Sequence, residues 1–179
     1  MFRLDIDEEI TLIQIQESHA EELFRLTDKS RKELREWLPW VDGTKSKRDS
    51  LTFIRLTLNS YEAKKALNCG IFYRGKLCGM AGFNSIDWQN LNAQVGYWLA
   101  TDFVGRGIMT RSVSGLIEYA FYELELNRIE IRAAVENSKS RAIPERLNFK
   151  HEGVVRQAEW LYDHFVDHAV YGLLRSEWR

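Results

Sequence analysis

The feature of the sequence that most constrains the fold is a change of periodicity between residues 67 and 124. Three segments with the composition of β-strands, residues 67–73, 76–86 and 92–100, follow one another with short connections. The run VGRGIMT follows the third segment, and residues 106–124 then carry apolar side chains at helical spacing. Adjacent strands that lead through a glycine loop into a long helix indicate a mixed α/β fold.

The remaining segments extend this pattern into one domain that spans residues 1–179. Residues 10–15 alternate like a half-buried strand, residues 19–26 and 50–67 have helical spacing, and Pro39 should end a short basic helix near Leu38. The dipeptide Arg74-Gly75 indicates a tight hairpin. Residues 128–135 form a further strand, residues 138–147 a helix, and two strands near residues 154–157 and 167–174 complete the order β-αα-βββ-α-β-α-ββ.

Charge and cysteine content exclude several classes of function. The formal net charge is -1, so no global basic field attracts nucleic acid or membrane. No apolar run approaches the ~20 residues of a membrane helix, and the acidic, alternating N-terminus does not look like a signal peptide. Cys69 and Cys78 have no metal-ligand companions nearby and are expected to be packing residues. We expect a cytoplasmic protein that binds neither nucleic acid nor membrane.

The glycine loop VGRGIMT allows two interpretations. The start of a helix presents unpaired N–H groups and a partial positive charge, so the loop could hold a phosphate. The glycines could equally serve only the backbone geometry of a turn between strand and helix. Neither the G-x-x-x-x-G-K-[ST] motif nor a complete G-x-G-x-x-G dinucleotide motif is present. The spacing of the two glycines alone leaves both interpretations open.

The order of elements around this loop resembles the GCN5-related N-acetyltransferase (GNAT) family. The family loop pattern Gln/Arg-x-x-Gly-x-Gly/Ala falls here on residues 104–109, where Gly107 matches the central glycine. Val104 and Met109 depart from the pattern at its two ends. The resemblance implies a mostly antiparallel central sheet of about seven strands, flanked by helices and splayed between the fourth and fifth strands.

The stretch ENSKSRAIPERLNFKHEG resembles a later segment of the same family, in which Asn-x-x-Ser begins a helix. Asn137 and Ser140 match these positions, and Leu147-Asn148-Phe149 matches the turn that ends the helix. From the residues alone, Asn137 or Ser138 is a good helix N-cap and needs no ligand. Pro144 lies inside the helix and removes a hydrogen bond to the carbonyl of Ser140, so we expect a kink or a freed carbonyl there.

The C-terminal stretch QAEWLYDHFVDHAVYGLL resembles the subgroup of ribosomal-protein-serine and -alanine N-terminal acetyltransferases. Residues 157–159 match its Gln-Ala-Glu strand, and the strand that holds the thioester matches GYWL at residues 96–99. His164, Asp167-His168 and Tyr171 stand near the expected places of its last strand, in an altered order. The resemblance covers nearly the whole chain.

The resemblance implies direct transfer of an acetyl group from acetyl-CoA to a primary amine. Glu159 matches the residue that takes a proton from the amine, and Ser140 matches the residue that returns one to the leaving thiolate. Tyr171 is a reserve proton donor. No metal is implied, because the histidines near Asp163 and Asp167 lack a third ligand at useful spacing. Cofactor-binding positions are Trp98, Leu99, Val104, Gly105, Arg106, Gly107, Ile108, Met109, Thr110 and Asn137.

Several readings remain open from the sequence. Glu159 could be an ordinary exposed strand residue, and Ser140 could simply cap its helix. The aromatic and basic residues between Arg31 and Arg48 could recognise a protein N-terminus or form a solvated surface. The acceptor is expected to be the N-terminal amine of a ribosomal protein, with a small-molecule amine as the alternative. A non-catalytic acetyl-CoA-binding module is a third reading, and exposed aromatics near Trp160 and Trp178 would favour a homo-oligomer.

Overall fold

The computed structural model describes residues 1–179, and its strands form one eight-stranded sheet in the order β1-β2-β3-β4-β5-β6-β8-β7. All neighbours in the sheet are antiparallel except β5 and β6. About seven strands were expected, and the additional one is β1, whose three residues are too few to show periodicity. The strands are β1 (Arg3–Asp5), β2 (Ile10–Gln14), β3 (Leu67–Tyr73), β4 (Lys76–Asp87), β5 (Asn92–Leu99), β6 (Arg128–Ala134), β7 (Lys150–Leu161) and β8 (His164–Leu174).

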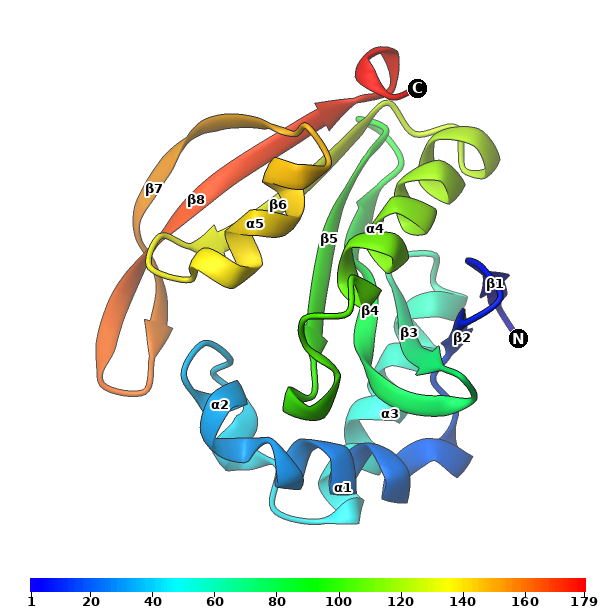
Figure 1. Cartoon of the computed structure of the whole chain (residues 1–179), viewed down its shortest axis with the longest axis vertical. Coiled ribbons are helices and arrows are strands. Elements are labelled where there is room, and N and C mark those ends of the chain that lie inside the picture. The colour runs from blue at the N-terminus through cyan, green and yellow to red at the C-terminus, as the bar shows by residue number, and fades with distance from the viewer.

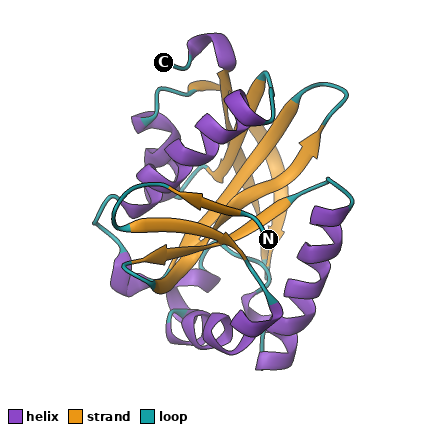
Figure 2. Cartoon of the chain, turned by 90° about the vertical axis from the view of Figure 1, so that its right-hand side faces the viewer, coloured by secondary structure: helices purple, strands orange, loops and turns teal.

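The helices cover both faces of this sheet, as Figures 1 and 2 show. The predicted helices are all present, although α3 begins three residues before its expected start at Ser50 and ends five before Leu67. Ser46 and Asp49 form a capping box at its start. The helices are α1 (Ala20–Lys29), α2 (Arg31–Arg35), α3 (Lys47–Glu62), α4 (Ile108–Glu118) and α5 (Ser138–Arg146).

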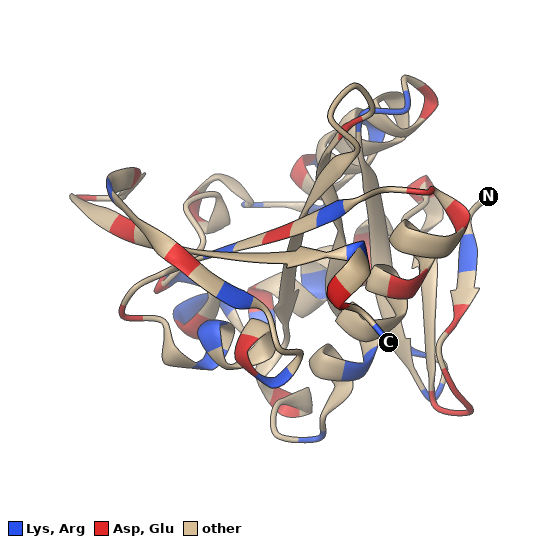
Figure 3. Cartoon of the chain, turned by 90° about the horizontal axis from the view of Figure 1, so that it is seen from above, with Lys and Arg blue, Asp and Glu red and all other residues tan.

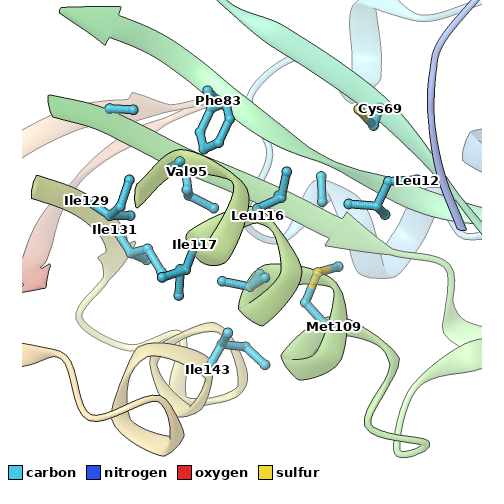
Figure 4. Close-up of a cluster of buried hydrophobic side chains, with 14 of the residues drawn as sticks. Leu12, Cys69, Phe83, Val95, Met109, Leu116, Ile117, Ile129, Ile131 and Ile143 are labelled. Atoms are coloured by element: carbon cyan, nitrogen blue, oxygen red, sulfur yellow. The ribbon is translucent and has the colours of Figure 1, made fainter. Parts of the chain in front are cut away.

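The core lies mainly between α4 and the sheet. The predicted apolar stripe of the long helix is buried there, and a π-helical turn at Tyr119–Glu123 continues it. Figure 4 shows Leu116 and Ile117 of this helix facing Val95 of β5 and Ile131 of β6. A smaller cluster of Leu23, Ile54, Met80 and three neighbours holds α1 and α3 against the opposite face. The burial of this stripe confirms the prediction, made from helical periodicity, of which face of α4 packs on the sheet.

The parallel strands β5 and β6 separate partway along their length. They pair from Asn92 and Arg128 as far as Val95 and Ile131. Beyond this point β5 continues to Leu99, paired only with β4, and β6 continues to Ala134, paired only with β8. The predicted splay between the fourth and fifth strands of the expected sheet is therefore confirmed as the gap between β5 and β6.

The β7–β8 hairpin is longer than expected and forms one edge of the sheet. Strands near residues 154–157 and 167–174 were predicted, whereas β7 spans 12 residues and β8 spans 11. Most residues of β7 are exposed, so little apolar periodicity marked the strand in the sequence. Figure 1 shows the hairpin extending from the top of the sheet toward α2.

The burial of the cysteines and tryptophans and the distribution of charge can be compared with what the sequence predicted. Cys69 and Cys78 are buried and unpaired, as expected of packing residues, and burial raises the pKa of the Cys78 thiol to about 12. Trp160 is exposed, whereas Trp178 packs against the core, so the expectation of an exposed aromatic there is wrong. Basic and acidic segments are interspersed along the ribbon in Figure 3. None of the helices has the length and apolar character needed to span a bilayer.

Candidate active site

The glycine loop forms a row of unpaired N–H groups at the start of α4. Gly105 and Gly107 have φ angles of 80° and 71°, left-handed values that favour glycine. None of the N–H groups of residues 105–110 donates a hydrogen bond within the chain. Six successive free donors at a helix N-terminus fit an anionic group such as a pyrophosphate. The loop can therefore bind a phosphate through its main-chain N–H groups alone.

The side chains of the loop explain its departures from the family pattern. Ile108 and Met109 are buried in the core, whereas Val104 is 47% exposed. Met109 therefore anchors the first turn of α4 to the sheet and does not occupy the space above the N–H groups. A large residue at this position is compatible with an anion site because its side chain points the other way.

Arg111 fixes the orientation of the loop, and we did not identify it from the sequence. Its guanidinium donates to the carbonyls of Gly107 (3.3 Å) and Arg106 (3.2 Å) and to the carboxylates of Asp7 (2.8 Å) and Glu9 (3.0 Å). Arg74 and then Arg111 lower the pKa of the Glu9 carboxyl. Because a trans peptide points its N–H opposite to its carbonyl, holding these carbonyls aims the next two N–H groups away from Arg111.

The end of β5 presents main-chain groups to the gap beside β6. The N–H of Ala100 donates to the carbonyl of Cys78 in β4 at 2.8 Å. Because hydrogen-bonding direction alternates along a strand, the N–H of Trp98 also faces β4, and that of Leu99 faces the gap. Of the two predicted thioester contacts, Leu99 is the one whose N–H is directed to the opening.

The carbonyl that Pro144 leaves free is bound by a side chain from the opposite wall of the gap. The helix α5 runs through Pro144 without interruption, and the Tyr97 hydroxyl donates to the carbonyl of Ser140 at 2.8 Å. Burial raises the pKa of the Tyr97 hydroxyl, which stays protonated and a donor. The expected freed carbonyl is confirmed, and it ties the first turn of α5 to β5.

Removing this hydrogen bond should loosen the joint between α5 and β5. Replacement of Tyr97 by phenylalanine is expected to lower the free energy of unfolding by about 1–3 kcal/mol, since it leaves a buried carbonyl without a donor. In a Pro144→Ala background the loss should be smaller, because residue 144 then supplies the helical N–H. Urea unfolding measures both effects, with Tyr122→Phe as the control for an exposed hydroxyl. Equal losses in the two backgrounds would contradict this account of the carbonyl.

The structure shows which of Asn137 and Ser140 caps the helix α5. The Asn137 side chain accepts from the Ser140 N–H at 3.2 Å, so Asn137 is the N-cap of α5. Ser140 is held by its N–H and its carbonyl, and its hydroxyl makes no hydrogen bond within the chain. The capping explanation therefore accounts for Asn137, whereas the Ser140 hydroxyl is left available.

Glu159 lies on β7 next to a histidine of β8. It pairs with Val166 in the sheet, and His168 Nε2 is 3.4 Å from its carboxylate. A bulge at residues 156–158 precedes it, where Gln157 has a φ of 49° and its N–H donates to Asp167 at 2.7 Å. The Glu159 side chain is 30% exposed, so it is neither an ordinary surface residue nor sealed from a substrate. His168, one of the histidines that lack a third metal ligand at useful spacing, is its neighbour.

Ser140 and Glu159 lie on opposite faces of the sheet. Tyr171 of β8 contacts α5 through Arg141 and Glu145, which places the α5 face on that side. His168 is three residues earlier in the strand, so it and its neighbour Glu159 lie on the other face. Tyr171, the reserve proton donor, already accepts from Arg141 (2.9 Å) and donates to Glu145 (2.8 Å).

A small aromatic cavity lies on the Glu159 side of the sheet, where α1, α3 and the segment after α2 meet β5. The Trp40 and Trp98 rings lie 5.9 Å apart. Of the basic residues in this region, Arg31 binds the carbonyls of Val41 and Thr44, whereas Lys45 is exposed. The cavity measures about 120 Å³ and is lined by Leu23, Thr27, Trp40, Thr44, Ser50, Phe53 and Trp98.

The histidines and carboxylates form pairs but no larger cluster. His164 contacts Asp163 at 2.6 Å at the exposed hairpin tip, apart from the His168–Glu159 pair. No group of three histidine, cysteine or acidic side chains is placed to hold a metal ion.

The chain is similar to known acetyltransferases. Residues 9–150 match the family model described as "Acetyltransferase (GNAT) domain". The "Putative ribosomal N-acetyltransferase YdaF" of Bacillus subtilis (strain 168) is 38% identical, with 99% of this chain and 98% of the relative covered. The ribosomal-protein-serine acetyltransferase of Escherichia coli (strain K12) is 29% identical, with 94% of each chain covered.

Solved structures with coenzyme A or acetyl-CoA bound have the same fold. RimL, a ribosomal L7/L12 alpha-N-protein acetyltransferase in complex with coenzyme A, superposes with a TM-score of 0.93 at 27% identity, covering 97% of this chain and 98% of its own. The microcin C7 self immunity acetyltransferase MccE, in complex with acetyl-CoA and AMP, has a TM-score of 0.91 at 32% identity and covers 94% of both chains.

Proposed function

Because this chain belongs to the acetyltransferase (GNAT) family, we propose that it acetylates the N-terminal α-amine of a protein, with a ribosomal protein as the acceptor. Acetyl-CoA is the co-substrate, as the complexes of the related structures indicate. It supplies an activated acetyl thioester. The family therefore gives the reaction type, and the acceptor is the proposed part.

The chain's own groups suit each task of this reaction. The free N–H groups of residues 105–110 would bind the pyrophosphate, and the Leu99 N–H would donate to the thioester carbonyl and to the oxyanion that develops from it. Glu159 would take the proton that the acceptor ammonium must lose before its nitrogen attacks. The Ser140 hydroxyl would then give a proton to the sulfur as the carbon–sulfur bond breaks, and the second proton lost by the attacking nitrogen would restore the hydroxyl.

The observation that carries this assignment is the placement of Ser140 and Glu159 on opposite faces of the sheet. A residue that deprotonates the incoming amine belongs on the acceptor side, and one that protonates the thiolate belongs on the cofactor side. The glycine loop begins α4, which packs on the same face as α5 and its Ser140. Glu159 stands on the other face, with the aromatic cavity.

A small-molecule amine is the second candidate acceptor. The cavity beside Trp40 and Trp98, of about 120 Å³, would hold a small group rather than a length of peptide. The related MccE, an immunity acetyltransferase whose structure contains AMP, shows that this fold also occurs outside ribosomal-protein acetylation. A non-catalytic acetyl-CoA-binding module is the third reading, and the available Ser140 hydroxyl and Glu159 carboxylate count against it.

An acetyl-transfer assay separates these readings. Purified protein is incubated with acetyl-CoA and either ribosomal proteins, N-terminal peptides or small amines, and acetylated products are identified by mass spectrometry. We expect acetylation of peptide N-termini and release of free thiol. Acetylation of small amines alone would replace the proposal with the second reading. Binding of acetyl-CoA without thiol release on any acceptor would favour the binding module.

A further inference from the structure

The tip of the β7–β8 hairpin is tied to the segment after α2 by one tyrosine side chain. The Tyr162 hydroxyl donates to the carbonyl of Leu38 and accepts from the N–H of Val41 at 3.2 Å. The guanidinium of Arg35 lies 3.9 Å from the centre of the Tyr162 ring. These contacts join segments more than 120 residues apart in the chain.

The backbone at Tyr162 is strained in a way that its contacts must offset. Tyr162 and Asp163 alone connect β7 to β8, and Tyr162 has a φ of 62°. Glycine, asparagine or aspartate is usual in that conformation, which costs other residues roughly 1–2 kcal/mol. A tyrosine stands there although a glycine would relieve the strain, and its side-chain contacts offset part of that cost.

The tie closes a ring of protein around the gap between β5 and β6. The Leu38–Val41 segment carries Trp40, whose ring contacts Trp98 at the end of β5. The hairpin carries Glu159 three residues before Tyr162. Since β7 pairs with β8, β8 with β6, and β6 with the start of β5, the ring is complete.

We propose that Tyr162 is a positioning residue that holds the Trp40 segment and the Glu159 hairpin at a fixed separation, so that the acceptor enters the ring end-on. The acceptor is then a free chain terminus or a small amine rather than a residue within a folded surface. This inference rests on the proposed function and deepens it. Tyr162 does not itself touch the reacting atoms in this role.

Kinetics of a Tyr162→Phe variant test the inference. The ring over Arg35 remains, but both hydrogen bonds are lost, and we expect kcat/KM for an N-terminal acceptor peptide to fall about tenfold. The fall should come from the KM for the peptide, with the KM for acetyl-CoA unchanged, because the glycine loop is on the other face. Tyr122→Phe is the matched control, since its exposed ring also lies under an arginine, Arg175.

A second variant and a second measurement keep the test independent of activity. Tyr162→Asn tolerates the left-handed turn and should raise the peptide KM further. Hydrogen exchange of residues 36–46 should be faster in both variants, because the Val41 N–H loses its acceptor. Unchanged exchange and peptide KM would overturn the role of Tyr162. A wild-type protein inactive on every acceptor would instead refute the proposed function, and exchange would still decide whether the tie exists.

Discussion

Replacement of Glu159 by glutamine is expected to lower kcat for acetyl transfer by about 100- to 10,000-fold, the usual contribution of a general base. Glutamine keeps the shape of the side chain but cannot take the proton of the acceptor amine. The affinity for acetyl-CoA should stay the same, because Glu159 lies on the face of the sheet opposite the glycine loop. Steady-state kinetics with an acceptor peptide and calorimetric titration with acetyl-CoA measure the two quantities.

A matched substitution separates this effect from a general loss of charge. Glu62 is an exposed residue at the end of α3, and its side chain makes no hydrogen bond or ion pair within the chain. Glu62→Gln should therefore have wild-type kcat. If Glu159→Gln also retains wild-type kcat, Glu159 is an ordinary strand residue and the base must be sought elsewhere on the acceptor face.

Replacement of Gly107 by valine should weaken the binding of acetyl-CoA at least tenfold. A Cβ at Gly107 would lie 4.0 Å from Arg111, so the methyl groups of valine would crowd the guanidinium that holds the carbonyls of Gly107 and Arg106 and thereby aims the loop N–H groups. Valine also disfavours the φ of 71° at this position, which should cost roughly 1–2 kcal/mol of stability. Calorimetry with acetyl-CoA gives the affinity, and urea unfolding gives the stability.

Gly75 provides a control with the same backbone strain. It has a φ of 80° in the turn between β3 and β4, and no atom lies within 4 Å of a Cβ built there. Gly75→Val should lose similar stability but bind acetyl-CoA normally. An equal loss of affinity in both variants would show that backbone strain, and not the orientation of the loop, explains the Gly107 effect, and would remove the loop from the proposed cofactor site.

The parts of the fold that depend on local periodicity could be predicted from the sequence. Side-chain spacing predicted the apolar stripe of α4 and the two strands of the β3–β4 hairpin. The missing N–H of Pro144 predicted the freed carbonyl of Ser140. The β7–β8 hairpin was only partly predicted, because its exposed side chains carry little apolar pattern. The β1 strand was missed because its three residues are too few to show an alternation of apolar and polar side chains.

The candidate site shows the same division between local and distant information. The sequence by itself determined the glycine loop and, through resemblance, the pairing of Ser140 with Glu159 as candidate proton carriers. Only the tertiary structure decided that Arg111 joins the loop to Asp7 and Glu9 and that Tyr162 ties the hairpin to the Trp40 segment. The reason is physical: periodicity and capping act between residues a few positions apart, whereas these contacts join groups that only the folding of the sheet brings within hydrogen-bond distance.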